Sequence, residues 1–162
     1  MKTAILTTAL GLLFSSLALA DNHGEAAEAK KADVEITITG NDAMQFDKKT
    51  LEATEGQVVK VTFKNIGALP KEAMGHNWVL LKSGTDLMQF ALAASKPDNR
   101  PNDFMPQDDE TKGKVLAHTK LLGPGEEDSV TFTAPAAGTY EYHCTVPGHF
   151  AIMRGVMTVK AK

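Results

Sequence analysis

The most constraining feature of this sequence lies near its carboxyl end, where three metal-binding types of side chain fall within ten residues. Cys144, the only cysteine of the chain, is followed by His149 and then by Met153. A thiolate, an imidazole and a thioether form a soft ligand set. They can surround one point if Cys144 leaves a strand, the chain turns sharply at Pro147-Gly148, and Met153 leads into another strand.

A candidate for the fourth ligand lies far upstream, where His76 stands in the segment Gly75-His76-Asn77-Trp78. Two histidines, one cysteine and a weak axial methionine form the ligand pattern of blue-copper electron-transfer sites. A single methionine such as Met153 is more often a core residue than a metal ligand, and His76 alone could be a structural histidine. The combination, together with an unpaired cysteine, favours copper.

The amino-terminal segment indicates export. Residues 1–20 begin with Lys2, continue as an apolar run and end in Ala18-Leu19-Ala20, which predicts a cleaved signal peptide rather than a membrane anchor. The mature protein would then be periplasmic, where a lone thiol requires an explanation such as a metal. We interpret residues 21–33, which are polar, as a flexible arm, and residues 34–162 as one domain. His23 in the arm would be solvated or, less favoured, part of an amino-terminal Cu(II) chelate.

The charge balance is ordinary for a soluble protein. The chain has 17 basic and 20 acidic residues, a formal net charge of −3. Nucleic-acid binding would call for a basic stripe, so this class receives no support.

Short stretches of alternating or β-branched residues recur along the chain and are separated by turn residues. This arrangement predicts an all-β sandwich or barrel. The predicted strands cover residues 34–39, 57–64, 77–82, 115–121, 128–134, 139–144 and 155–160.

Two further segments break the strand pattern. Residues 85–95 carry apolar residues at helical spacing before Pro97, which predicts one short helix packed on the sandwich. We interpret residues 98–113 as a long polar loop.

In the strand before the cysteine, alternation places Tyr142 and Cys144 inward and predicts that His143 faces outward.

Residues 34–160 resemble the azurins, bacterial blue copper proteins of the cupredoxin family, and the similar auracyanins. The resemblance rests on the four residues between Cys144 and His149 and on several further segments. These are residues 40–46, 69–71, 74–80, 117–120, 125–132 and 144–149. It implies a cupredoxin-like Greek-key β-sandwich.

The resemblance also implies the roles of the site residues. His76, Cys144 and His149 would be equatorial ligands of one type 1 copper ion. Met153 and the carbonyl of Gly75 would be weak axial ligands. Two residues would support them: Asn77, tying the ligand loops together, and the backbone N–H of Val146, donating to the Cys144 sulfur.

An apolar docking patch around His149 is a further implication of the resemblance. Transient redox proteins would bind there, such as c-type cytochromes, and copper nitrite reductase or other terminal acceptors. The protein itself would be a monomeric electron carrier, neither an enzyme nor membrane-anchored. The expected patch residues are Met44, Leu69, Ala73, Met74, Val146, Phe150, Ala151 and Ile152.

Two alternatives belong to other functional classes. His143, beside the cysteine, could bind a second copper in an enzyme component. A copper storage or delivery protein would instead use a more exposed, methionine-rich site. The sequence also departs from the azurins: Val34 and Gly56 replace a disulfide pair, and Asn65 replaces a buried histidine.

Overall fold

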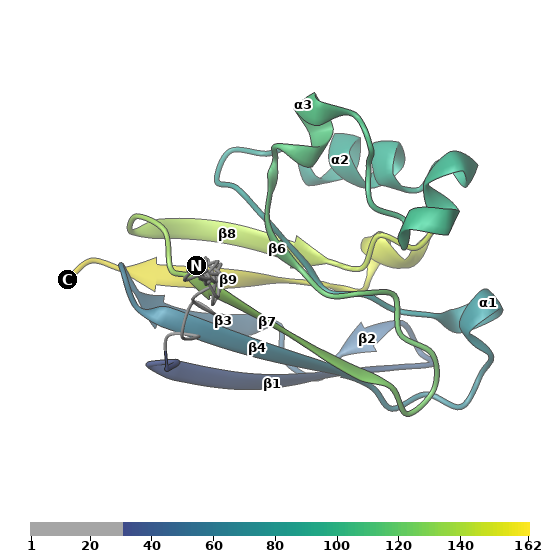
Figure 1. Cartoon of the computed structure of the whole chain (residues 1–162), viewed down its shortest axis with the longest axis horizontal. Coiled ribbons are helices and arrows are strands. Elements are labelled where there is room, and N and C mark those ends of the chain that lie inside the picture. Colours follow the sequence, from purple (N-terminus) through teal and green to yellow (C-terminus); the bar gives the residue numbers. More distant parts are fainter. Residues whose placement is uncertain (1–30) are drawn as a thin grey trace, which may run out of the picture.

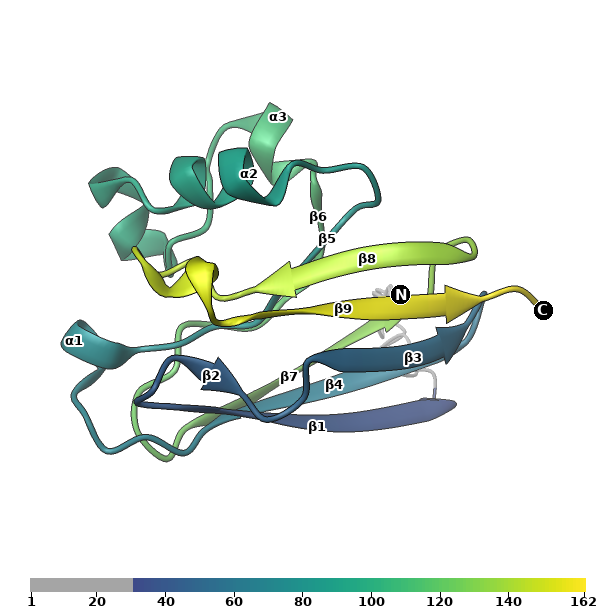
Figure 2. The same ribbon diagram turned by 180° about the vertical axis from the view of Figure 1, so that it is seen from behind.

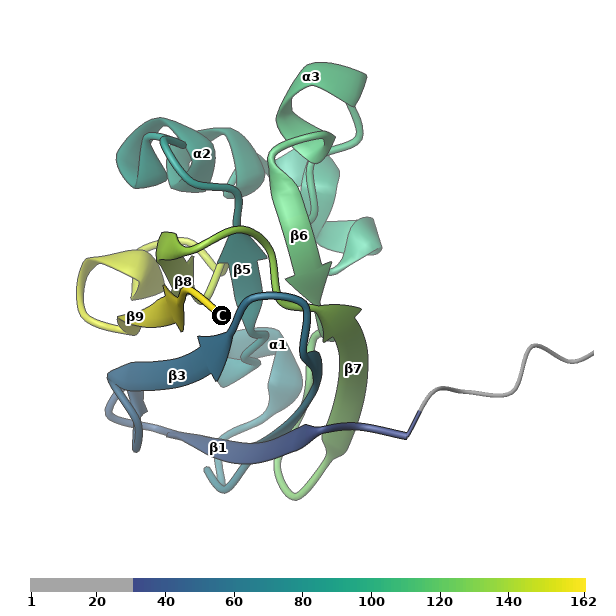
Figure 3. The same cartoon turned by 90° about the vertical axis from the view of Figure 1, so that its left-hand side faces the viewer.

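The computed structural model describes residues 31–162, so the predicted signal peptide and most of the predicted arm lie outside the described residues. The described chain forms two sheets packed face to face, seen from two sides in Figures 1 and 2 and end-on in Figure 3. One sheet has the order β2-β1-β4-β7 and the other β3-β9-β8-β5-β6. The all-β sandwich is thus confirmed. The strands are β1 (Val34–Asn41), β2 (Gln45–Phe46), β3 (Thr50–Thr54), β4 (Val58–Asn65), β5 (Val79–Leu81), β6 (Val115–His118), β7 (Glu127–Thr133), β8 (Gly138–His143) and β9 (Arg154–Lys160).

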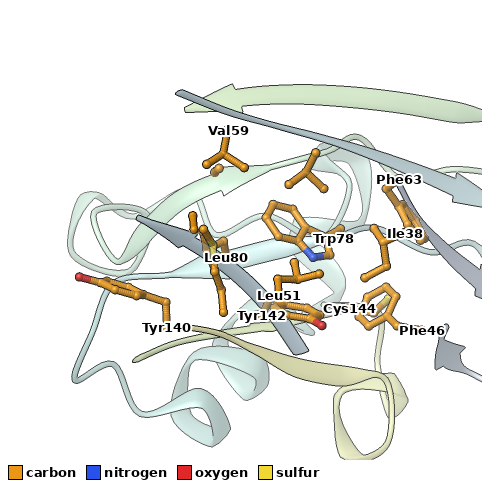
Figure 4. Close-up of a cluster of buried hydrophobic side chains, with 14 of the residues drawn as sticks. Ile38, Phe46, Leu51, Val59, Phe63, Trp78, Leu80, Tyr140, Tyr142 and Cys144 are labelled. Carbon is orange, nitrogen blue, oxygen red and sulfur yellow. The ribbon is translucent and has the colours of Figure 1, made fainter. Parts of the chain in front are cut away.

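The period-two alternation of the strands builds the core between the sheets. On β4, Val59, Val61 and Phe63 are fully buried, while the residues between them are partly exposed. Tyr140 and Tyr142 of β8 point into the same core from the other sheet, and Trp78 lies among them (Figure 4). Cys144 belongs to this cluster. Cys144, a predicted metal ligand, is therefore fixed by the same packing that holds the sheets together.

The strand order brings distant segments side by side. β1 runs parallel to β4, and β3 runs parallel to β9. In the second sheet, β8 lies between β9 and β5, with Val79 opposite His143. The segment that precedes β5 and the segment that follows β8 therefore emerge as neighbours at one end of the sandwich, beside the loop that carries α1 (Figure 2).

The prediction of a single helix is incomplete. The expected helix is present as α2 (Leu87–Ala94), begun by Asp86, whose Oδ1 accepts from the Gln89 N–H at 3.0 Å. The structure adds several elements of at most six residues, which are too short to produce an apolar periodicity in the sequence. They are α1 (Lys71–Met74), α3 (Asp109–Lys112) and the 3₁₀ turns η1 (Pro97–Asn102) and η2 (His149–Ala151). The expected polar loop 98–113 thus contains most of η1 and all of α3.

The prediction for His143 gives the right direction, but the residue is not exposed to solvent. Its side chain does point away from Tyr142 and the central core, but it is fully buried. The reason is that residues 82–114, here called the β5–β6 insert, cover the outer face of the second sheet (Figure 1). Phe90 of α2 meets the His143 ring edge-on, with ring centroids 5.5 Å apart.

Within residues 31–162, no helix has both the length and the apolar character needed to cross a membrane.

Candidate metal centre

The loop after β8 is closed on itself by backbone hydrogen bonds. The Cys144 N–H donates to the Met153 carbonyl at 3.0 Å, and the Met153 N–H donates to the His149 carbonyl at 2.8 Å. Gly148 has a φ of 82°, a conformation that disfavours side-chain-bearing residues and lets the chain reverse just before His149. Cys144, His149 and Met153 are therefore held by one compact loop, as the spacing predicts.

His76 reaches this loop from the segment between α1 and β5. Its backbone pairs with Leu122, with N–H to carbonyl distances of 3.0 Å and 2.7 Å in the two directions. The Leu122 carbonyl also accepts from Asn65 Nδ2 at 3.0 Å. Asn65, which is buried, thus supports the backbone that positions His76.

Three potential ligand atoms converge on one point. Nδ1 of His76 and Nδ1 of His149 are 3.2 Å apart, and the Cys144 sulfur lies 4.0 Å from the first and 3.6 Å from the second. With the ligand distances known for zinc, about 2.0 Å to each nitrogen and about 2.3 Å to the sulfur, a trigonal arrangement gives spacings of about 3.5 Å between the nitrogens and about 3.7 Å from nitrogen to sulfur. The observed spacings agree within a few tenths of an ångström, so the donor set fits a metal ion.

Burial dominates the electrostatics of the three groups. It raises the pKa of the Cys144 thiol to about 12, opposed by the backbone N–H groups of Asn77 and Val146, which favour the thiolate. It also lowers the pKa of His76, and burial together with the neighbouring His76 lowers the pKa of His149 to about 4. Near neutral pH the metal-free site therefore holds two neutral imidazoles and a protonated thiol.

The side chain of Asn77 connects the two ligand segments. The Thr145 N–H donates to Asn77 Oδ1 at 2.9 Å, and Asn77 Nδ2 donates to Thr145 Oγ1 at 2.6 Å. Asn77 follows His76 in sequence, and Thr145 follows Cys144. Because Asn77 is fully buried, water does not compete for these bonds.

The predicted weak ligands lie in the same region. Met153 is fully buried at the end of the ligand loop, and its terminal methyl lies beside Gly40. Gly75 is buried directly before His76, where an added Cβ would come 2.6 Å from the Lys71 carbonyl.

The predicted patch residues divide into two groups. Leu69, Ala73, Ala151 and Ile152 are exposed, whereas Met44, Met74, Val146 and Phe150 are only partly so. Phe150 packs against the cluster under α2, which leaves it less of its ring for a partner. His149 is 5% exposed while His76 and Cys144 are fully buried. It borders a cleft of about 430 Å³ that is also lined by Ala73, Val146 and Pro147.

Some supporting residues were not identified from the sequence. Thr145 has a weak signal, because it directly follows Cys144. Leu122 and Asp103 act through backbone carbonyls, which any residue type supplies, so no pattern identifies them.

Comparison with known proteins agrees with this geometry. Residues 32–160 match the model of the copper binding proteins, plastocyanin/azurin family. The chain belongs to this family. It is 44% identical over 130 residues to Azurin-1 of Alcaligenes xylosoxydans xylosoxydans, covering 78% of this chain and 97% of that protein. It is 40% identical over 136 residues to an azurin of Bordetella pertussis, covering 82% and 87%.

Solved structures of the same kind superpose on this member of the plastocyanin/azurin family. Dithionite-reduced auracyanin of Roseiflexus castenholzii gives a TM-score of 0.66 at 40% identity, covering 80% of this chain and 98% of that one. Family membership and the convergent His76, Cys144 and His149 make the protein a type 1 copper protein that carries single electrons.

Proposed function

We propose that the protein shuttles electrons in the periplasm between redox proteins, with electrons entering and leaving at His149. One observation supports this above the others: two imidazoles and one thiol converge in a buried site, and only His149 among them has any exposure. A bound copper ion would supply the one-electron Cu(I)/Cu(II) couple. Residues 1–20 support the periplasmic location through their signal-peptide pattern.

The chain's own residues would perform three tasks. His76, Cys144 and His149 would hold the ion, with Met153 and the Gly75 carbonyl as weaker ligands. Asn77 and the Val146 N–H keep the thiolate in place and favour its charge, as their effect on the Cys144 pKa indicates. The sandwich holds all of them in one arrangement, which limits ligand movement between oxidation states.

The patch would dock partners transiently. Leu69 and Ile152 expose 45% and 48% of their surface close to the ligand loops, and Ala73 lines the His149 cleft. Weak apolar contact of this kind suits rapid exchange with c-type cytochromes, and with copper nitrite reductase or other terminal acceptors. The protein would work as a monomer and would catalyse no reaction of its own.

The test combines a metal count with rapid kinetics. The copper-loaded protein should hold one copper per chain and oxidise a reduced c-type cytochrome rapidly in stopped flow. Two coppers per chain, one of them lost in His143→Ala, would instead favour the enzyme alternative. Copper that binds as Cu(I) and cannot be oxidised reversibly would favour storage or delivery.

A further inference from the structure

The β5–β6 insert contacts the segment that carries His76 through a hydrogen bond to the side chain of Asn77. Besides its bond to Thr145, Asn77 Nδ2 donates to the backbone carbonyl of Asp103 at 2.9 Å. Both amide hydrogens of this buried side chain are thus used, one on the ligand loop and one on the insert. The Asp103 carbonyl therefore restrains the rotamer from which Asn77 bonds Thr145.

The backbone at this contact has an unusual conformation. Asp103 and Phe104 both have a φ of 57°, in the left-handed region. Aspartate tolerates this region, but a bulky phenylalanine there is a genuine outlier. Such a corner persists only when surrounding contacts determine it, and these corners cluster at functional sites.

Several contacts hold the corner in place. The Phe104 N–H donates to the Asn99 carbonyl at 2.9 Å, and the Phe104 side chain is only 9% exposed. Asn99 is buried in turn, and its Nδ2 donates to the carbonyls of Ala93 and Ala94 at the end of α2, at 2.9 Å and 3.2 Å. α2 packs on β5, which begins two residues after Asn77, so the corner is anchored close to the side chain that its carbonyl bonds.

We propose that Asp103 is a positioning residue for the copper site, acting through its backbone carbonyl and left-handed conformation rather than through its carboxylate. It fixes Asn77, and Asn77 fixes Thr145 and with it Cys144, the residue directly before Thr145. The β5–β6 insert is then a third support of the site, beside the two ligand segments. This inference rests on Cys144 being a ligand, but its first test requires no metal.

The test compares two substitutions at the same position. Asp103→Gly removes the carboxylate and introduces glycine, which adopts a φ of 57° readily. Asp103→Val removes the same carboxylate and introduces a β-branched residue that opposes this conformation. Hydrogen exchange of the Thr145 N–H, which donates to Asn77, is measured by NMR in the metal-free protein. The reference is the N–H of the fully buried Val61 on the interior strand β4, which reports global opening.

The proposal predicts that Thr145 exchanges about tenfold faster relative to Val61 in Asp103→Val, and within about twofold of the parent in Asp103→Gly. In the copper-loaded proteins the reduction potential should shift in the valine variant alone. Equal Thr145 protection in both variants, or equal loss in both, would overturn the proposal. If the valine variant does not fold, Asp103→Ala carries the same comparison with a smaller conformational penalty. A protein that binds no copper would refute the function and leave the exchange result standing.

Discussion

His143 is the residue whose environment is least expected for its type. Both ring nitrogens are buried without a hydrogen-bond partner in the described structure, and the ring lies against Phe90. Burial lowers the pKa of His143 to about 4. An unsatisfied buried polar group costs about 1–3 kcal/mol, so this position lowers the stability of the fold.

Replacing His143 with phenylalanine should therefore stabilise the protein. We expect a gain of about 1–3 kcal/mol in the free energy of unfolding at pH 7, measured by denaturant titration. The unfolded histidine takes up a proton near pH 6.5 and the folded one only near pH 4, so the parent loses stability as the pH falls through this window. The advantage of the variant should grow by roughly 3 kcal/mol between pH 7 and pH 4.

The matched control is His118→Gln, because His118 is exposed on β6. It should change stability little at either pH. A phenylalanine variant that is less stable than the parent at both pH values would show that His143 has a partner or role that this account omits.

Cys144 leads to a prediction about metal uptake. The metal-free thiol is protonated, with a pKa near 12, while both imidazoles are neutral because their pKa values are lowered. A bound ion requires the thiolate, so uptake near pH 7 should release about one proton per ion. Titration calorimetry in buffers of different ionisation enthalpy measures this number. A value near two or three would mean that the histidines are charged in the metal-free protein.

At the scale of elements, β1 passes unusually close to the ligand loop. A Cβ on Gly40 would lie 2.6 Å from the Met153 methyl and 2.9 Å from Phe63 Cζ. Gly40→Ala must therefore displace Met153, and we expect a loss of about 1–3 kcal/mol in stability by overpacking. The reduction potential should shift as well if Met153 is an axial ligand.

Gly138→Ala on β8 is the control, because a Cβ there would be 3.6 Å from the nearest atom, on Tyr140. That contact is ordinary, so stability and potential should change little. An unchanged potential in Gly40→Ala, despite the lost stability, would argue against an axial role for Met153.

The elements that were predictable from the sequence are those with a strong local pattern. β1, β4 and β7–β9 follow clear alternation or β-branched runs, and α2 follows its apolar spacing. β3 was not predicted because Leu51 and Ala53 are its only buried residues. It is stabilised by parallel pairing with β9, which lies more than a hundred residues later in the chain. Non-local pairing of this kind leaves no local signal.

The candidate site divides in the same way. The side chains of His76, Cys144 and His149 were identified because their residue types are specific to metal chemistry. The carbonyls of Asp103 and Leu122 were not, since every residue has one. His143 was misjudged because alternation along a strand gives the direction of a side chain but not what covers it, and here α2 covers it.

At the scale of the whole molecule, the copper site and the proposed docking patch share one end of the sandwich. Ala151 is exposed at the end of η2, the turn that begins with His149. Ala151→Asp places a charge where a partner would have to desolvate it, so electron exchange with a c-type cytochrome should slow by about tenfold or more. The visible spectrum should stay unchanged. Stopped-flow kinetics measures the rate.

Ala136→Asp serves as the control for added charge. Ala136 is exposed in the turn between β7 and β8, at the opposite end of the sandwich (Figure 1). This variant should exchange electrons at the parent rate. Equal rates for all three proteins would remove the patch from the account of docking.

The central claim is that one sulfur and two imidazoles hold a single copper ion. Its most direct test is the visible absorption spectrum of the oxidised, copper-loaded protein beside that of Cys144→Ser. The account predicts an intense thiolate-to-copper band in the parent and none in the serine variant. An intense band that survives in Cys144→Ser, or a copper-loaded parent without one, would contradict it.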